Sequence, residues 1–402
     1  MKYVIVLGDG MADYPIEEIG NQTVIEHANT PTLDALAAES EIGMVQTVPE
    51  GMSPGSDTAN LSVIGYAPDK YYSGRSPLEA LSIGVDMKPT DISFRCNIVT
   101  VSEDEEKYED KTIIDHSSSE ISTEDAAVLL KAVSDVLEKE YAGYKFYVGT
   151  SYRHLTIWEN GSVLPLTPPH DILGKGIGEY LPEDTVLYEM MKKSYDILVN
   201  HPINVERKKQ GLNPANSIWF WGAGTRPALS DFKQKNGKSG VMISAVDLLK
   251  GIAVGAGMKV VEVEGANGGL HTNYEGKALA AVKALCDDGY DFAYIHVEAP
   301  DEMGHQGSLE KKIQAVENLD EKVIRVVKEQ LEAKGEAFRL LVLPDHPTPI
   351  CIRTHVGEPV PYLLYDSEEK VASEWLYNEK DAKKSGKYIE NGHELIDHLF
   401  EK

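Results

Sequence analysis

The segment YDFAYIHVEAPDEMGH, residues 290–305, indicates the fold of this chain. Its first half, Tyr290–Val297, is an apolar run of strand length, and Phe338–Leu343 is a second one. Continuous apolar runs of this kind are typical of strands that are buried on both faces of a parallel sheet. Residue types that bind metals follow both runs: Asp301 and His305 after the first, Asp345 and His346 after the second.

Helical and strand patterns alternate on either side of this segment. The N-terminal run Tyr3–Leu7 is a further apolar strand, and it ends at Gly8-Asp9-Gly10. Strand and helix alternation builds βα units on a mostly parallel sheet, so we expect an α/β fold whose parallel sheet is flanked by helices. The C-terminal part contributes predicted helices at 244–254, 273–287 and 309–333 and a predicted strand at 258–263.

The middle of the chain has a different pattern of helical and strand segments, which predicts an inserted α+β domain. Alternating residues run from Ile92 to Val101 and a long helical pattern covers Ser122–Glu140. The runs Arg153–Trp158 and Ser162–Leu166 flank Asn160-Gly161, a strong hairpin signal. A chain of 402 residues also exceeds the usual single-domain size. We therefore predict a core of residues 1–88 plus 217–402, interrupted by a domain of residues 89–216.

Charge and cysteine content restrict the partners and the compartment. The formal charge of -26 argues against nucleic acid, whose phosphates require a basic surface. An anionic small molecule would need a local cluster of basic residues or metal ions. The three cysteines form no CxxC pair, and the N-terminal apolar run is too short for a signal peptide or a membrane span. These features predict a cytoplasmic protein that does not bind a membrane.

Several candidate metal ligands follow predicted strands. Ligands of open parallel sheets bind beyond the carboxyl ends of the strands, so these positions are informative. The spacing of Asp301 and His305 would place both side chains on one face of a helical turn. Taken singly, each candidate is also compatible with a solvated loop or a turn. Their occurrence together is what indicates a metal site. The set comprises Asp9, Asp301, His305, Asp345, His346 and His355.

Ser56 is the candidate nucleophile. It stands after Gly55 at the predicted start of a helix, where a serine is also a good N-cap. Next to metal ligands it would instead be a nucleophile that receives a phosphoryl group. Two other patterns are not nucleotide loops: Gly8-Asp9-Gly10 lacks the third glycine of a dinucleotide motif, and Gly237-Lys238-Ser239 lacks the first glycine of a P-loop.

These motifs together resemble the cofactor-independent phosphoglycerate mutases of the short, archaeal type, within the alkaline-phosphatase superfamily. The resemblance extends over nearly the whole chain. Besides the candidate ligands and residues 55–60, it is carried by residues 73–80, 219–224 and 272–278.

The resemblance implies a phosphatase-like fold and an isomerase that interconverts 3-phosphoglycerate and 2-phosphoglycerate through a phosphoserine at Ser56, without 2,3-bisphosphoglycerate. One divalent ion would be held by Asp9, Ser56, Asp345 and His346, and a second by Asp301, His305 and His355. Mixed carboxylate and imidazole ligands favour manganese, then zinc, then magnesium. The inserted domain would orient the glycerate. The matching candidates are Arg153, Arg226, Lys277 and His116, and Arg75 would contact phosphate or be structural.

Three alternatives remain open from the residues. The first is a homoserine kinase-like transfer to another small alcohol, for which we find no nucleotide loop. The second is a metal-dependent phosphatase or phosphopentomutase on the same core. The third is a noncatalytic binding protein that a metal stabilises, which would not need Ser56.

Overall fold

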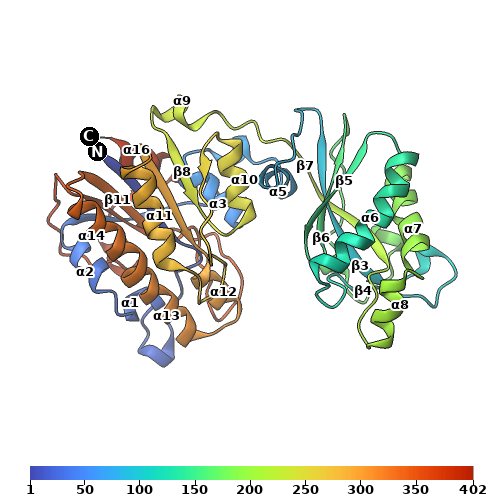
Figure 1. Cartoon of the computed structure of the whole chain (residues 1–402). Coiled ribbons are helices and arrows are strands. Elements are labelled where there is room, and N and C mark those ends of the chain that lie inside the picture. Colours follow the sequence, from blue (N-terminus) through green and yellow to red (C-terminus); the bar gives the residue numbers. More distant parts are fainter. Residues whose placement is uncertain (402) are drawn as a thin grey trace. The chain divides into compact units, whose positions relative to one another are not determined.

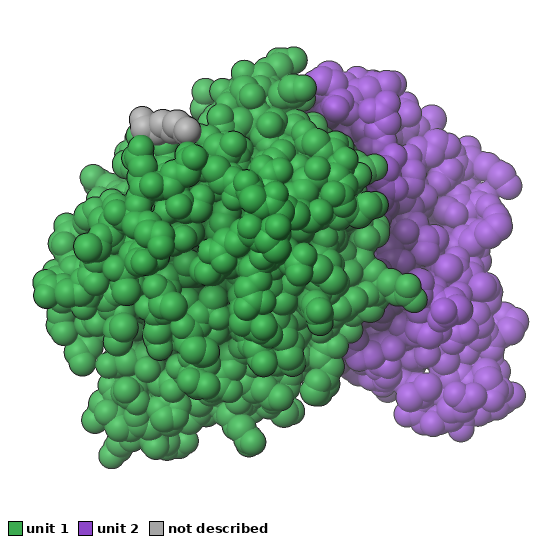
Figure 2. All heavy atoms as spheres, turned by 60° about the vertical axis from the view of Figure 1, so that its left-hand side comes forward, with its two compact units in different colours: residues 1–72, 228–402 green, residues 73–227 purple. Residues whose placement is uncertain are grey.

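The computed structural model of the chain describes residues 1–401 and divides it into two compact units. Unit 1 consists of residues 1–72 and 228–401, and unit 2 of residues 73–227 (Figures 1 and 2). The chain therefore leaves unit 1 once, builds unit 2 as a single continuous stretch, and returns.

Unit 1 is built on an eight-stranded sheet in the order β13-β2-β12-β11-β1-β10-β8-β9. Strand β1 is central and pairs in parallel with both β10 and β11, and only β12 runs against the other strands. The strands are β1 (Lys2–Gly8), β2 (Ser40–Val45), β8 (Gly240–Ile243), β9 (Lys259–Val260), β10 (Phe292–Val297), β11 (Phe338–Leu343), β12 (Val360–Asp366) and β13 (Tyr388–Ile389). The predicted α/β class with a mostly parallel sheet is confirmed.

Helices cover both faces of this sheet. Two residues of β1 that face opposite sides of the sheet, Tyr3 and Gly8, lie against different helices. Tyr3 stacks edge-on against Phe400 of α16, whereas a Cβ on Gly8 would lie 2.9 Å from Leu319 of α13. Figure 1 shows α11 beside the long α13–α14 helix. The helices of unit 1 are α1 (Val24–His27), α2 (Pro31–Ala37), α3 (Ser56–Val63), α4 (Pro68–Tyr71), α9 (Phe232–Asn236), α10 (Asp247–Gly255), α11 (Tyr274–Cys286), α12 (Ala299–His305), α13 (Leu309–Leu319), α14 (Arg325–Ala333), α15 (Glu379–Lys384) and α16 (Leu395–Phe400).

The C-terminal βα pattern agrees with its prediction, with two local differences. The predicted helix 309–333 is one continuous run that contains a π-helical segment, Asp320–Ile324, between α13 and α14. The predicted strand 258–263 forms a ladder only over Lys259–Val260. At that position β9 is the last strand of the sheet and lies against only one neighbour, β8, so fewer contacts extend it.

Unit 2 is an α+β structure around an antiparallel sheet. Its long strand β3 pairs with β4, β6 and β7, and β6 also pairs with β5. The elements are α5 (Arg75–Ser82), β3 (Ile92–Val101), β4 (Ile113–Asp115), α6 (Thr123–Glu140), β5 (Tyr144–Thr150), β6 (Arg153–Trp158), α7 (Thr185–Leu198), α8 (Pro202–Lys209) and β7 (Ser217–Thr225). Its own buried core includes Phe94, Leu129, Met190 and Trp219.

The limits of the inserted unit differ from the predicted 89–216. Helix α5 packs on β3 and β7, and β7 pairs with β3 along most of its length, so both belong to unit 2. The unit therefore begins at Ser73 and ends at Pro227. Local sequence patterns could not locate these limits, because the strand that pairs with residues 217–225 lies more than a hundred residues earlier in the chain.

The predicted hairpin around Asn160-Gly161 is wrong. Residues 162–166 form no strand, and β6 pairs instead with β5 and β3. With both edges of β6 already paired, no edge remains for a third strand. Pro165 also lacks the N–H that a ladder requires.

Candidate active site

Three neighbouring strands of unit 1 bring the candidate ligands to one edge of the sheet. Asp9 follows β1, α12 follows β10, and Asp345-His346 follows β11. Because β10 and β11 flank β1 in parallel register, the residues after these strands emerge side by side at the carboxyl edge.

Asp9, Asp345 and His346 form a first, fully buried group. His346 Nε2 lies 3.6 Å from Asp9 Oδ1 and 3.4 Å from Asp345 Oδ2. One donor atom of each residue lies within 4.8 Å of the others, which is the spacing of a metal site. Ser56 Oγ lies 3.2 Å from the same His346 Nε2.

Asp301, His346 and His355 form a second group with the same spacing. His355 Nε2 lies 3.4 Å from Asp301 Oδ1. The segment 299–305 is helical, so His305 Nε2 lies 3.1 Å from Asp301 Oδ2 and 3.0 Å from His355 Nε2. His346 belongs to both groups by distance, whereas the sequence analysis assigned it to the first ion alone.

The charges of this region fit a divalent cation. Asp9 Oδ1 is buried and has no hydrogen-bond partner among the described residues. Burial, together with the negative charges of Asp345 and Asp301, raises the pKa of Asp9, so this carboxylate is costly without a cation. Burial opposes ionisation of Asp301 as well, but hydrogen bonds from His305 and His355 leave its pKa below the ordinary value. The bond to Asp301 raises the pKa of His305 to about 9.

Ser56 is not the cap of its helix. It is the first residue of α3, and Gly55 occupies the N-cap position. Asn60, one turn further along, donates to the Ser56 carbonyl and to Asp345 Oδ2 at 2.8 and 2.9 Å, and Tyr294 donates to Asn60 Oδ1 at 2.5 Å. Helix α3, which carries the candidate nucleophile, is thus hydrogen-bonded directly to a candidate metal ligand.

Thr348 fixes the hydrogen position of the His346 ring. A carboxylate only accepts hydrogen bonds, so the Thr348 hydroxyl donates to Asp301 Oδ1, at 2.5 Å. It then accepts from His346 Nδ1, at 3.2 Å. The lone pair of His346 is therefore on Nε2, which faces Asp9, Asp345 and Ser56.

Gly10 is required by the close packing of this loop. Its φ is +60°, and a Cβ would lie 2.5 Å from both Asp301 Oδ1 and Thr348 Oγ1. Its N–H donates to Asp345 Oδ1 at 3.0 Å. The glycine after Asp9 therefore brings the backbone against the ligand carboxylates.

Relatives of this chain share one description. The family model described as 2,3-bisphosphoglycerate-independent phosphoglycerate mutase matches residues 37–204. A protein of that name from Methanosarcina barkeri is 46% identical over 402 residues, which cover 98% of each chain. The chain belongs to this family. The solved cofactor-independent phosphoglycerate mutase of Thermoplasma acidophilum has a TM-score of 0.67 at 26% identity and covers 99% of each chain. The PH0037 protein from Pyrococcus horikoshii has a TM-score of 0.81 at 28% identity, covering 99% of this chain and 96% of its own. These names do not favour the homoserine kinase-like alternative.

The substrate-contact residues expected in a phosphoglycerate mutase lie in different parts of the chain. Arg153 and Arg226 are exposed in unit 2, and Arg226 Nη1 donates to the Met87 carbonyl at 2.8 Å. The ring of His116, also in unit 2, lies 5.6 Å from that of Tyr152. Arg75 pairs with Glu79 on the exposed side of α5.

Lys277 lies in unit 1, within the predicted core 217–402, and not in unit 2 with Arg153 and Arg226. It is on α11 of unit 1 and is wholly buried. Its ammonium donates to the His296 carbonyl at 3.0 Å, and burial lowers the pKa of Lys277 to about 8.

Unit 2 of this mutase-family chain also holds a basic and aromatic cluster that the sequence did not reveal. The Arg95 guanidinium lies 4.5 Å from the centre of the Trp221 ring, and the His170 ring lies 5.2 Å from Trp221 and 6.0 Å from His116. In the sequence, Arg95 is one polar residue in an alternating strand, so only the sheet pairing shows which residues surround it.

Other residues near the ligands were also missed, although signals existed. His296 interrupts an apolar strand, Asn60 follows Ser56 by one helical turn, and Thr348 follows His346 by two positions. Each is polar and fully buried, a combination that requires hydrogen-bond partners.

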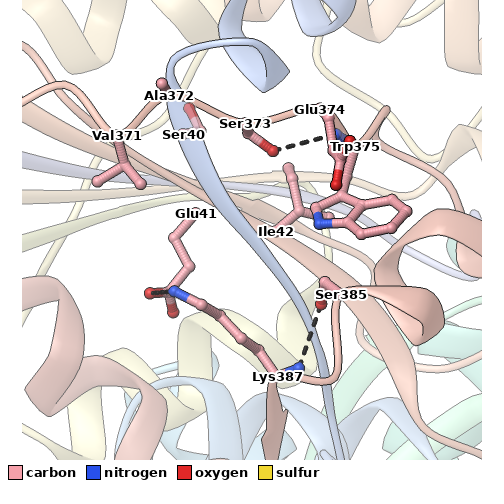
Figure 3. A pocket seen from close by; sticks show the side chains of 10 residues that line it. All are labelled: Ser40, Glu41, Ile42, Val371, Ala372, Ser373, Glu374, Trp375, Ser385 and Lys387. Carbon is pink, nitrogen blue, oxygen red and sulfur yellow. Dashed lines mark hydrogen bonds and ion pairs between the residues drawn. The ribbon is translucent and has the colours of Figure 1, made fainter.

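A separate pocket lies at the amino-terminal half of β2. Figure 3 shows it between Ile42, Val371 and Trp375, with the Lys387 ammonium paired to the Glu41 carboxylate. Because β2 runs parallel to β11, this half of β2 is directed away from the edge that carries Asp345. The pocket contains no candidate ligand. No helix among residues 1–401 is long and apolar enough to cross a membrane.

Proposed function

We propose that this protein interconverts 3-phosphoglycerate and 2-phosphoglycerate without 2,3-bisphosphoglycerate, with Ser56 as the phosphate acceptor. The observation that carries the proposal is the distance of 3.2 Å from Ser56 Oγ to His346 Nε2, inside a buried group of carboxylates and imidazoles. The names of its full-length relatives supply the substrate.

The donor set supports two divalent ions, manganese or zinc before magnesium. Asp9, Ser56, Asp345 and His346 would hold one ion, and Asp301, His305 and His355 the other. His346 is also within reach of the second group. When bound, such ions lower the pKa of a hydroxyl and offset the charge of phosphate oxygens.

Ser56 carries the covalent step. It loses its hydroxyl proton and forms a bond from Oγ to phosphorus, while the bond from phosphorus to the glycerate oxygen breaks and that oxygen gains a proton. The glycerate then turns, and its other hydroxyl displaces Ser56 by the same exchange in reverse. Water must be kept out, because hydrolysis of the phosphoserine would make the enzyme a phosphatase.

Basic residues of unit 2 would retain the glycerate while it turns. Arg153, Arg226 and His116 are the candidates, since guanidinium groups bind carboxylate and phosphate through two parallel hydrogen bonds. They would also overcome locally the net charge of -26 that repels an anion. The same charge argues against nucleic acid as a partner, and the cytoplasmic location stays a prediction.

The test is conversion of 3-phosphoglycerate to 2-phosphoglycerate by metal-loaded protein without added bisphosphoglycerate. Chelator-treated protein and Ser56→Ala are expected to lose nearly all turnover. Thr58→Ala, a hydroxyl deletion on the same helix, serves as the matched control and should retain activity. Undiminished turnover by Ser56→Ala would reject the nucleophile. No turnover by the wild type with manganese, zinc or magnesium would reject the substrate, and homoserine with ATP would be assayed next.

A further inference from the structure

His296 is buried beneath the candidate ligand Asp9. It lies in β10, between β1 and β8, and its side chain is inaccessible to solvent. Its Nε2 lies 2.8 Å from Asp9 Oδ2, and its Nδ1 lies 3.2 Å from Ser244 Oγ. Asp9 and Ser244 directly follow β1 and β8, so one row of hydrogen bonds joins the ends of three neighbouring strands.

The direction of each hydrogen bond in this row is determined. A carboxylate only accepts, so the neutral ring carries its hydrogen on Nε2 and donates it to Asp9 Oδ2. Nδ1 then carries the lone pair and accepts from the Ser244 hydroxyl, whose oxygen also accepts the Val246 N–H at 3.0 Å. Burial and the nearby Lys277 ammonium keep the pKa of His296 well below its usual value, in agreement with a neutral ring.

This arrangement leaves the two oxygens of Asp9 in different states. Oδ2 is occupied by His296, whereas Oδ1 is buried without a partner among the described residues and lies 3.6 Å from His346 Nε2. The backbone at His296 is fixed as well, since the Lys277 ammonium donates to the His296 carbonyl at 3.0 Å.

We propose that His296 is a positioning residue that holds Asp9 Oδ2 and thereby presents Oδ1 alone to a divalent ion. It acts through Asp9 and does not contact the substrate. The inference rests on the proposed function, because it presumes that Asp9 is a metal ligand. Ser244 assists by fixing the ring tautomer, and Lys277 by fixing the backbone of β10.

The test measures Mn²⁺ affinity by calorimetry on chelator-treated full-length protein. Outer hydrogen-bond partners of metal ligands typically contribute about 10- to 100-fold in affinity. We expect a loss of that size for His296→Leu and affinity near wild type for His296→Gln, whose side-chain amide nitrogen can replace Nε2 as donor. Ser244→Ala should weaken binding by a few fold. His154→Leu, a buried histidine of unit 2, should leave affinity unchanged.

The outcomes separate this inference from the proposed function. Wild-type protein that binds no Mn²⁺, Zn²⁺ or Mg²⁺ would reject the metal site itself. Wild-type protein that binds Mn²⁺, with equal affinity in His296→Leu and Ser244→Ala, would overturn the positioning role alone. Should His296→Leu not fold, Ser244→Ala decides, because it leaves the imidazole in place and removes only the hydroxyl that contacts Nδ1 and the Val246 N–H.

Discussion

Lys312 offers the sharpest test of how the ligand loops are held. It lies in α13 with its ammonium wholly buried, and it donates to Asp13 Oδ2 at 2.8 Å, to the Thr348 carbonyl at 2.8 Å and to the Ala12 carbonyl at 3.2 Å. Two of these partners follow Asp9 closely in the chain, and Thr348 follows His346. The Lys312 ammonium therefore joins both loops that carry candidate ligands.

The substitution Lys312→Met keeps an unbranched side chain, one atom shorter, and removes the charge. Breaking one partner of a buried ion pair costs about 3–5 kcal/mol of unfolding free energy. Asp13 would keep the Tyr14 N–H at 2.8 Å and the Ile350 N–H at 3.2 Å. Burial also lowers the pKa of Lys312, so the variant regains part of the cost of burying an ammonium. We therefore expect the lower end, about 3 kcal/mol.

Urea unfolding of metal-free protein, followed by circular dichroism, measures this loss. With a slope of about 1–3 kcal/mol per molar urea, the midpoint of unit 1 should fall by about 1–3 M. Hydrogen exchange should rise in residues 9–13 and 345–350 and stay unchanged in unit 2. Lys311→Met is the matched control, since Lys311 is the exposed neighbour on the same helix. A loss below about 1 kcal/mol, equal to that of the control, would refute the reasoning.

Two further predictions concern single residues in each unit. Gly10→Ala should weaken Mn²⁺ binding strongly, because its Cβ would collide with Asp301 and Thr348. Gly20→Ala is the control: Gly20 has a φ of +75° but open space around it, so this variant should lose only about 1–2 kcal/mol of unfolding free energy. Calorimetry and urea unfolding of the pair check this, and equal metal affinity in both variants would contradict it. Burial lowers the pKa of His154 from 6.5 to about 4, so the unfolded chain takes up a proton first as the pH falls. His154 should therefore cost the protein about 3 kcal/mol between pH 6.5 and pH 4, and His154→Asn should remove that part of the pH dependence in urea unfolding.

The local patterns of the sequence predicted the central strands correctly. The runs Tyr3–Leu7 and Phe338–Leu343 are β-branched and apolar over a strand length, and both strands are present within a residue or two of those limits. The same local logic placed candidate ligands after these strands. It failed at residues 162–166, because strand pairing depends on which edges other segments have already taken.

The sequence by itself thus determined that this chain builds a parallel sheet with Asp9, Ser56 and acid–histidine pairs at its carboxyl edge, since residue type and spacing are local properties. Only the tertiary structure decided how these groups are connected. His346 lies within reach of both groups, and Lys312, Thr348 and His296 hold the loops of candidate ligands through contacts between segments far apart in the chain. The physical reason is that a hydrogen bond depends on the direction of two side chains. That direction follows from the order and register of the strands, which no single segment encodes.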